Sequence, residues 1–202
     1  SKVLSAARNG RDTFYCTNRF WGMREACQKS NTERWVRLFE SFCDPPARVA
    51  RPETYLFPEE VGQFNRESKQ YASRSYILKP DDQSCGRGIS LALDRSEAIR
   101  LGFQSNAVGK RGEDVVVQEY VDNPLLFRGR KFDLRLYVVI TGVRNNQLQY
   151  AYEREWCFAR IAGAKYAKPT RLNAGNLRVH LSNTTFAEDK EAAKQSAEAV
   201  LE

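Results

Sequence analysis

The stretch YILKPDDQSCGRGISLAL, residues 76–93, places a loop with two glycines between two apolar runs. The runs have the composition of β-strands, so the stretch predicts a hairpin. Lys79 ends the first run, and Arg87 lies between the glycines. Glycines let backbone N–H groups approach a polyphosphate closely, and cations neutralise its charge. One interpretation is a hairpin that covers phosphates; the other is an ordinary turn with Arg87 in solvent.

Further along the chain, KFDLRLYVVITGV, residues 131–143, alternates between apolar and polar side chains, which predicts one strand. Lys131, Asp133 and Arg135 share its charged face. Ionisable side chains are costly to bury unless they pair or meet a ligand. Two interpretations stay open: an Asp–Arg ion pair beside a solvated lysine, or an ion-lined floor for phosphates, a metal or a carboxylate substrate.

Periodicity and capping patterns predict three helices. The first begins with a capping box of Ser30 and Glu33 and carries an aromatic face. The second begins at Asp94 and ends near Gly102. The third covers residues 187–202, which are rich in Ala, Glu and Lys.

The remaining segments are predicted to be strands and a linker. VVVQEYV, residues 115–121, has the continuous apolar character of a buried strand. A turn at residues 145–146 leads into the strand QLQYAY, residues 147–152. We interpret RPETYLFPEE, residues 51–60, as an extended linker. The backbone of QEYV could hold an adenine edge, or its polar side chains could simply face solvent.

Composition limits the class of protein and its partners. The 202 residues, 42% hydrophobic and 28% charged, suffice for one sizeable core or two small domains. The net charge of +7 favours an acidic partner: nucleic acid, an anionic membrane, a polyphosphate or a glutamate-rich protein. No apolar run reaches the roughly 20 residues of a membrane span. Because the sequence begins with Ser1 and not methionine, we expect a fragment or a processed chain.

Cysteine and histidine usage argues against a zinc site or a disulfide framework. The five cysteines are widely scattered and form no Cys-x-x-Cys pair. His180 is the only histidine in the sequence. It could be a general base, but the sequence places no nucleophile beside it. We therefore expect His180 to have a hydrogen-bonded structural role.

The order of these segments resembles the tubulin tyrosine ligase-like family over roughly residues 50–190. The resemblance is carried by RPETYLFP, YILKPDDQSCGRGI, VVQEYVDNPLLFRGRKFDLRLYV, CFARIAGAKY and VHLSN. It implies an α+β, ATP-grasp-like fold of mostly antiparallel sheets with flanking helices, incomplete at the C-terminal end. The implied domains are an N-terminal helical and linker region (1–70), a central subdomain with the glycine-rich hairpin (71–124) and the first part of a C-terminal subdomain (125–202).

The resemblance also implies a site for ATP and Mg²⁺. Lys79 would meet the α- and β-phosphates, and Arg160 would bind the carboxylate of an incoming amino acid. The implied site residues are: catalytic, Lys131, Asp133 and Arg135; nucleotide-binding, Lys79, Arg87, Gly88, Gln118, Glu119, Tyr120, Val121, Lys131, Asp133, Ser182 and Asn183; substrate-binding, Arg160.

The implied reaction is an ATP-dependent ligation of glutamate, or glycine, to glutamate side chains of tubulin C-terminal tails. It proceeds through an acyl phosphate. The implied partners are tubulin or microtubules and a free amino acid, with neither a membrane nor nucleic acid expected. The implied location is the cytoplasm and cytoskeleton, with the cilium, flagellum or basal body as candidates. Which amino acid is added stays open.

Two rivals differ in class from this ligase. One is a non-catalytic protein that keeps the same fold on microtubules or in a larger assembly. The other is an unrelated basic protein that binds nucleic acid, although regularly spaced surface aromatics are missing. In the family, a later acidic residue and a Glu-x-Asn motif hold Mg²⁺, whereas this sequence ends at Glu202. Glu188 and Asp189 are expected to begin a solvated helix, so the metal ligands stay unassigned and turnover stays open.

Overall fold

The structure, a computed structural model, describes residues 25, 27–43, 49–70, 73–81, 83–108, 114–145, 147–152, 157–187, 194–196 and 199–200. The chain divides into two units, Ser1–Val49 and Ala50–Glu202. The predicted boundaries near residues 70 and 124 stay a prediction.

In the first unit, α3 (Lys29–Phe42) is the predicted helix, but its start differs from the prediction. The helix begins one residue before Ser30, and the N-cap residue Gln28 makes no side-chain cap bond. The predicted capping box is therefore wrong. Ser30 and Glu33 are buried within the helix, and the Glu33 carboxylate pairs instead with Arg37, one turn on, at 2.8 Å.

In the second unit, four antiparallel strands form the main sheet. Their order is β1 (Thr54–Phe57), β4 (Val115–Glu119), β2 (Tyr76–Pro80) and β3 (Ser90–Ala92). β2 and β3 flank the glycine-rich loop, so the predicted hairpin is confirmed. The linker predicted over residues 51–60 is wrong, because all four residues of β1 are buried and pair with β4. Four residues are too few for periodicity to reveal a strand whose partner lies some 60 positions away.

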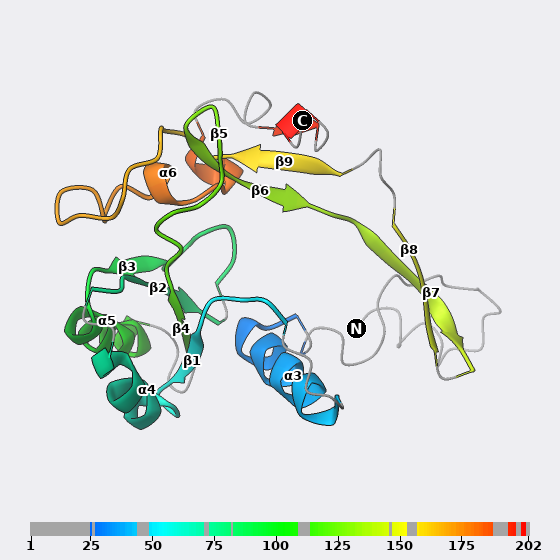
Figure 1. The fold of residues 1–202 in the computed structure, drawn as a ribbon, viewed down its shortest axis with the longest axis horizontal. Helices are drawn as coiled ribbons and strands as arrows, with labels where there is room; N and C mark the ends of the chain where they lie inside the picture. The colour runs from blue at the N-terminus through cyan, green and yellow to red at the C-terminus, as the bar shows by residue number, and fades with distance from the viewer. Residues whose placement is uncertain are drawn as a thin grey trace, which may run out of the picture. The chain divides into compact units, whose positions relative to one another are not determined.

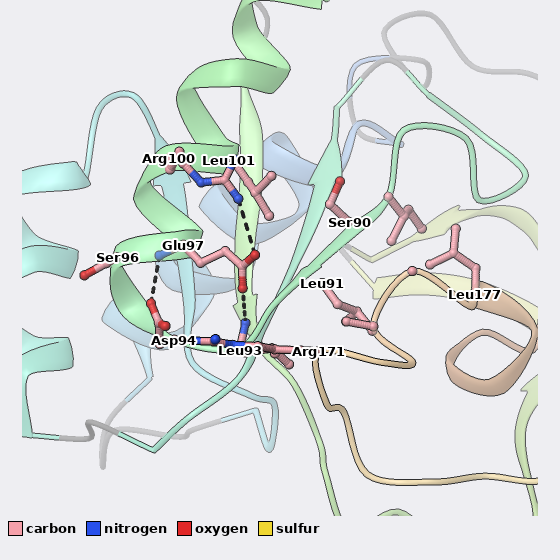
Figure 2. A pocket seen from close by; sticks show the side chains of 13 residues that line it. Ser90, Leu91, Leu93, Asp94, Ser96, Glu97, Arg100, Leu101, Arg171 and Leu177 are labelled. Atoms are coloured by element: carbon pink, nitrogen blue, oxygen red, sulfur yellow. Dashed lines mark hydrogen bonds and ion pairs between the residues drawn. The ribbon is translucent and has the colours of Figure 1, made fainter.

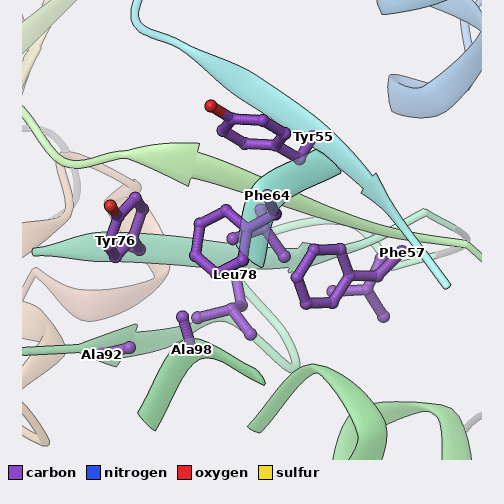
Figure 3. Close-up of a cluster of buried hydrophobic side chains, with 9 residues drawn as sticks. Tyr55, Phe57, Phe64, Tyr76, Leu78, Ala92 and Ala98 are labelled. Atoms are coloured by element: carbon purple, nitrogen blue, oxygen red, sulfur yellow. The ribbon is translucent and has the colours of Figure 1, made fainter. Parts of the chain in front are cut away.

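The main core lies between this sheet and the helices α4 (Val61–Glu67) and α5 (Arg95–Val108), which cover one face of the sheet (Figure 1). Because successive strand residues face opposite sides of a sheet, Tyr55 and Tyr76 point toward the helices. Both rings meet the Phe64 ring edge-on with centroids 5.0 Å apart (Figure 3). Burial of each such side chain stabilises the fold by roughly 1.5–3 kcal/mol.

Helix α5 begins as predicted but continues past its predicted end. The Asp94 carboxylate accepts a hydrogen bond from the Glu97 N–H at 2.8 Å, and the Glu97 carboxylate accepts one from the Leu93 N–H at 2.9 Å. The Asp94 side chain thus caps the helix, and the Glu97 side chain binds the backbone of the residue before the cap. The prediction of an end near Gly102 is wrong, since the helix runs to Val108. Gly102 lies inside the helix, where the Phe57 ring leaves no room for a side chain.

A second antiparallel sheet has the order β10 (Lys194–Ser196), β9 (Phe158–Ile161), β6 (Arg130–Arg135) and β5 (Leu126–Phe127). The turn between β5 and β6 is the two-residue pair Arg128–Gly129, with φ of 50° and 74°. Strand β10 lies where a helix was predicted over residues 187–202. That prediction is wrong at residues 194–196, where pairing with β9 overrides a helical composition. Glu188 and Asp189 lie outside the described residues.

The single strand predicted over residues 131–143 is two strands. β6 ends at Arg135 and pairs with β9, whereas β7 (Val138–Arg144) pairs with β8 (Gln147–Tyr152). The alternation of side chains runs through both strands, so it does not reveal the change of partner. The turn predicted at residues 145–146 is confirmed at Asn145, which has φ 51°; Asn146 lies outside the described residues.

Candidate functional site

A cleft of about 310 Å³ opens on the face of the main sheet that turns away from α4 and α5. Ile77, Leu91, Tyr120 and Leu181 pack together on this face. The cleft is formed by β2, the end of β4, β6 and residues 180–183. The predicted site residues that line it are Lys79, Gln118, Glu119, Tyr120, Val121, Lys131, Asp133, Ser182 and Asn183.

The glycine-rich loop lies beside the cleft, although its predicted residues do not line it. Gly86 has φ 79°, and a Cβ atom there would lie 2.6 Å from the Phe186 ring and 3.5 Å from Asn183 Oδ1. The loop backbone therefore approaches the segment whose Asn183 lines the cleft. The Arg87 side chain is exposed, and its Nε donates to the Ser84 carbonyl at 3.4 Å. Gly88 follows in the same loop.

The other two predicted residues outside the lining lie on the second sheet. Arg135 is the last residue of β6 and is exposed. Arg160 on β9 lies opposite Asp133 and bonds to its carboxylate, but it does not line the cleft.

A hydrogen-bonded row of side chains crosses the main sheet and fixes Lys79. The Lys79 ammonium donates to Gln118 Oε1 at 2.7 Å, and Gln118 Nε2 donates to Thr54 Oγ1 at 2.8 Å. The row forms because Thr54 and Ile77 lie in register with Gln118, and Lys79 points to the same face two residues after Ile77. Thr54 was not predicted as a site residue, because residues 51–60 were interpreted as a linker. The β-prone run TYLF, bounded by prolines, was the available signal.

Lys131 projects into the same cleft from β6. Its ammonium group donates to the Tyr120 hydroxyl at 3.1 Å and lies 4.2 Å from the centroid of that ring. Burial, followed by the positive charge of Lys79, lowers the pKa of Lys131 to about 8. Among the residues that the structure describes, no carboxylate lies within ion-pair distance of the Lys131 ammonium. Lys79 and Lys131 therefore bring two ammonium groups to the lining of one cleft, where an anion could bind.

Asp133 differs from the two lysines, because its carboxylate accepts three hydrogen bonds from other side chains of the protein. Arg160 donates to it through Nε at 2.6 Å and through Nη2 at 2.8 Å, and the Ser182 hydroxyl donates a third hydrogen bond. An Asp–Arg pair is thus present on this face, formed between strands and not with Arg135. The lysine beside it is half-buried, so features of both sequence interpretations occur together.

A larger cavity of about 700 Å³ lies near the N-terminus of α5 (Figure 2). Asp94 and Glu97 cap this helix there, and Glu97 pairs with Arg100 at 3.3 Å. These charged groups make hydrogen bonds and an ion pair at the start of the helix, whereas two lysines from different strands line the smaller cleft. The smaller cleft is therefore the candidate functional site.

Comparison with known proteins identifies the family. The model of the tubulin-tyrosine ligase family matches residues 9–201. The chain belongs to this family. Its antiparallel sheets with flanking helices agree with the α+β, ATP-grasp-like fold of the family, of which the chain holds a part.

Curated relatives carry tubulin polyglutamylase names. Human tubulin polyglutamylase TTLL13 is 33% identical over 174 residues, which are 84% of this chain and 19% of that protein. Human tubulin polyglutamylase TTLL6 is 30% identical over 82% of this chain and 17% of that protein. Mouse tubulin polyglutamylase TTLL7 is 30% identical over the same shares. The chain therefore spans less than a fifth of the length of these relatives.

Proposed function

We propose that this chain contributes the nucleotide site of an ATP-dependent ligase that adds an amino acid to glutamate side chains of tubulin tails. The observation that carries the proposal is the convergence of Lys79 and Lys131 on one cleft in a member of this family. Two ammonium groups that share a cleft repel each other, and a polyphosphate between them removes the repulsion.

The proposed chemistry has two steps. A tubulin glutamate γ-carboxylate attacks the γ-phosphorus of ATP, giving an acyl phosphate and ADP. The amine of a free amino acid then attacks the acyl carbon, phosphate leaves, and the nitrogen loses a proton as the amide forms. Lys79 and Lys131 would hold the phosphates and stabilise their charge, while the loop at Arg87 and Gly88 would lie over them. Catalysis of this kind depends on positioning and charge stabilisation.

The donor set of the cleft fits a nucleotide better than it fits a bare metal ion. The proposal includes Mg²⁺ together with ATP, since Mg²⁺ balances phosphate charge. Within the described ranges, no three His, Cys, Asp or Glu side chains gather as metal ligands. Asp133 is committed to Arg160 and Ser182. We therefore assign no protein ligand to Mg²⁺.

The identity of the partners is also part of the proposal. The names of the relatives favour glutamate over glycine as the added amino acid. A net charge of +7 suits an acidic tubulin tail. We place the protein at the cytoskeleton, on microtubules, with the cilium as a candidate site. Of the helices that the structure describes, none has the length and apolar character to cross a membrane.

Nucleotide binding is tested by calorimetry and thermal unfolding with Mg-ATP. We expect the chain to bind and to be stabilised, because a ligand that binds only the folded state raises the unfolding temperature. Lys79→Ala should weaken binding by about tenfold or more, the loss expected for a hydrogen bond between charged groups. Lys69→Ala, at an exposed lysine in the turn Ser68–Gln70, is the control. No binding by the folded protein contradicts the nucleotide site.

Ligation is tested with the full-length protein, tubulin, ATP and labelled glutamate or glycine in separate reactions. Incorporation of label into the tubulin tail supports the ligase, and the labelled amino acid that is used gives the specificity. Nucleotide binding without incorporation of either amino acid favours the non-catalytic alternative.

A further inference from the structure

A chain of hydrogen bonds runs along the wall of the cleft from Lys131 to a backbone carbonyl. The Lys131 ammonium is 3.1 Å from the Tyr120 hydroxyl, which is 3.0 Å from His180 Nδ1. His180 Nε2 is 3.1 Å from the carbonyl oxygen of Asn173. His180 is only 2% exposed and Tyr120 only 5%. Two regions of the sequence, residues 120–131 and residues 173–180, therefore meet in one polar chain.

The donor and acceptor character of these groups favours one direction for the hydrogen bonds. The Asn173 carbonyl can only accept, so His180 Nε2 carries the hydrogen. Burial lowers the pKa of His180, so the imidazole is neutral and its Nδ1 accepts a hydrogen bond from the Tyr120 hydroxyl. The Tyr120 oxygen then offers its lone pairs to the Lys131 ammonium, which can only donate. The histidine thus orients the tyrosine, and the tyrosine orients the lysine.

The Lys131 ammonium donates a hydrogen bond to the Tyr120 hydroxyl, and its other described neighbours are mainly aromatic rings. The ammonium lies over the rings of Tyr120 and Tyr166, at 4.2 Å and 5.6 Å from their centroids. Asp133, two residues along the same strand face, bonds instead to Arg160 and Ser182. The positive charge of Lys79 also acts on the Lys131 ammonium.

We propose that Tyr120 and His180 are positioning residues that hold the Lys131 ammonium in the cleft for an anionic ligand. That ligand is the phosphate of ATP, so the inference rests on the function proposed above. Both ring nitrogens of His180 are engaged, and the side chain is enclosed. His180 therefore acts on the ligand through Tyr120 and Lys131.

The tautomer is tested directly by NMR. His180 is the only histidine in the 202-residue sequence, so a chain labelled with ¹⁵N-histidine gives one imidazole. At pH 7 we expect a protonated Nε2 and an unprotonated Nδ1. Tyr120→Phe removes one oxygen atom, keeps the ring over Lys131 and should shift the Nδ1 resonance. Tyr55→Phe, which removes another largely buried hydroxyl bonded to Glu67, should leave it unchanged. A protonated Nδ1 overturns the inference.

The effect on the ligand is tested by Mg-ATP titration of the same three proteins. Tyr120→Phe should bind about three- to tenfold more weakly, the loss expected for one ordinary hydrogen bond. Tyr55→Phe should bind as the unchanged protein does. Thermal unfolding of each protein checks that it is folded.

The outcomes separate this inference from the proposed function. If the unchanged protein binds ATP and Tyr120→Phe binds it equally well, the positioning role is wrong and the nucleotide site stands. If the folded, unchanged protein does not bind ATP, the proposed function and the inference both fail. Weaker binding by Tyr120→Phe together with the expected tautomer supports both.

Discussion

Arg160 lies directly opposite Asp133 on the neighbouring strand and donates two hydrogen bonds to its carboxylate, at 2.6 Å and 2.8 Å. Ser182 donates a third from the segment that follows α6 (Leu177–His180). One carboxylate thus joins β6, β9 and the segment that carries Asn183. A guanidinium fork matches a carboxylate well, which gives the pair a defined geometry.

Replacing this arginine tests how much the pair stabilises the fold. Arg160→Met removes both hydrogen bonds to Asp133. We expect the free energy of unfolding in urea to fall by about 1 kcal/mol, because partly exposed ion pairs contribute little more than this. The side chains of Arg160 and Asp133 are 22% and 36% exposed.

A double-mutant cycle with Asp133→Asn isolates the pair from other effects of the two substitutions. If the two changes add without coupling, the pair does not stabilise the fold. Arg160→Lys keeps the charge and loses the fork, so it should recover only part of the loss.

The affinity for Mg-ATP should depend on pH through Lys131. Its pKa of about 8 lies below the ordinary value of 10.5, and bound phosphate raises it again. Below pH 7 the group is charged with or without ligand. As the pH rises through 8, binding must take up a proton, and the affinity should fall by up to about tenfold per pH unit. Burial lowers the pKa of His180 and raises those of Tyr120 and Tyr166, so these groups do not titrate between pH 7 and 9.

Lys131→Arg is the matched control, because arginine stays charged throughout this range. Ionisation of ATP itself is common to both proteins, so calorimetric titrations at several pH values are compared as a ratio. A ratio that does not change between pH 7 and 9 would show that Lys131 is not the titrating group.

Local sequence patterns correctly predicted those helices and strands that depend on residues close together in the sequence. The hairpin around the glycine-rich loop and the helix start at Asp94 follow from short stretches of sequence, and the structure contains both. Strand β1 and strand β10 are specified by distant partners, β4 and β9. A propensity pattern contains no information on such pairings, which explains why both segments were misassigned.

In the candidate site too, the features set by nearby residues were predicted, and those set by the pairing of distant strands were not. Alternation along β6 placed Lys131 and Asp133 on one face, and both line the cleft. The partner of Asp133 depends on the register between β6 and β9, which the sequence pattern does not reveal. The chain from Lys131 through Tyr120 to His180 depends on the packing of the two sheets, although a hydrogen-bonded role for His180 was expected. The roles assigned to these residues toward a ligand stay predictions.

Gly102 in α5 should resist substitution by alanine, although alanine favours helices by about 1 kcal/mol over glycine. A Cβ atom at this position would lie 2.6 Å from the Phe57 ring, which is fully buried and cannot move aside. We expect Gly102→Ala to lower the free energy of unfolding by roughly 1–3 kcal/mol, since overpacking outweighs the gain in propensity.

Urea denaturation measures the effect of Gly102→Ala. The variant Gly62→Ala in α4 is the control, because its nearest neighbour is the flexible end of Arg66 at 3.7 Å. Equal stability of the two variants, or a stabilised Gly102→Ala protein, would mean that the Phe57 ring accommodates the methyl group.

Gly86 should be required both for its backbone conformation and for its contact with Phe186. Its φ of 79° favours glycine, and a Cβ atom would lie 2.6 Å from the Phe186 ring. Gly129 provides a matched control: its φ is 74°, and nothing lies within 4 Å of the position of a Cβ atom. Alanine at either site has the backbone cost of about 1 kcal/mol, but only at Gly86 is there a steric cost in addition.

We therefore expect Gly86→Ala to lower the unfolding temperature more than Gly129→Ala does, and to weaken Mg-ATP binding, because the displaced loop no longer lies against the segment of Asn183. Thermal unfolding and calorimetry measure the two effects. Phe186→Leu combined with Gly86→Ala should recover part of the loss, since a smaller side chain makes room for the methyl group. If Gly86→Ala and Gly129→Ala behave alike in both measurements, the contact with Phe186 does not hold the loop in place. In that case the position of Arg87 does not depend on this contact.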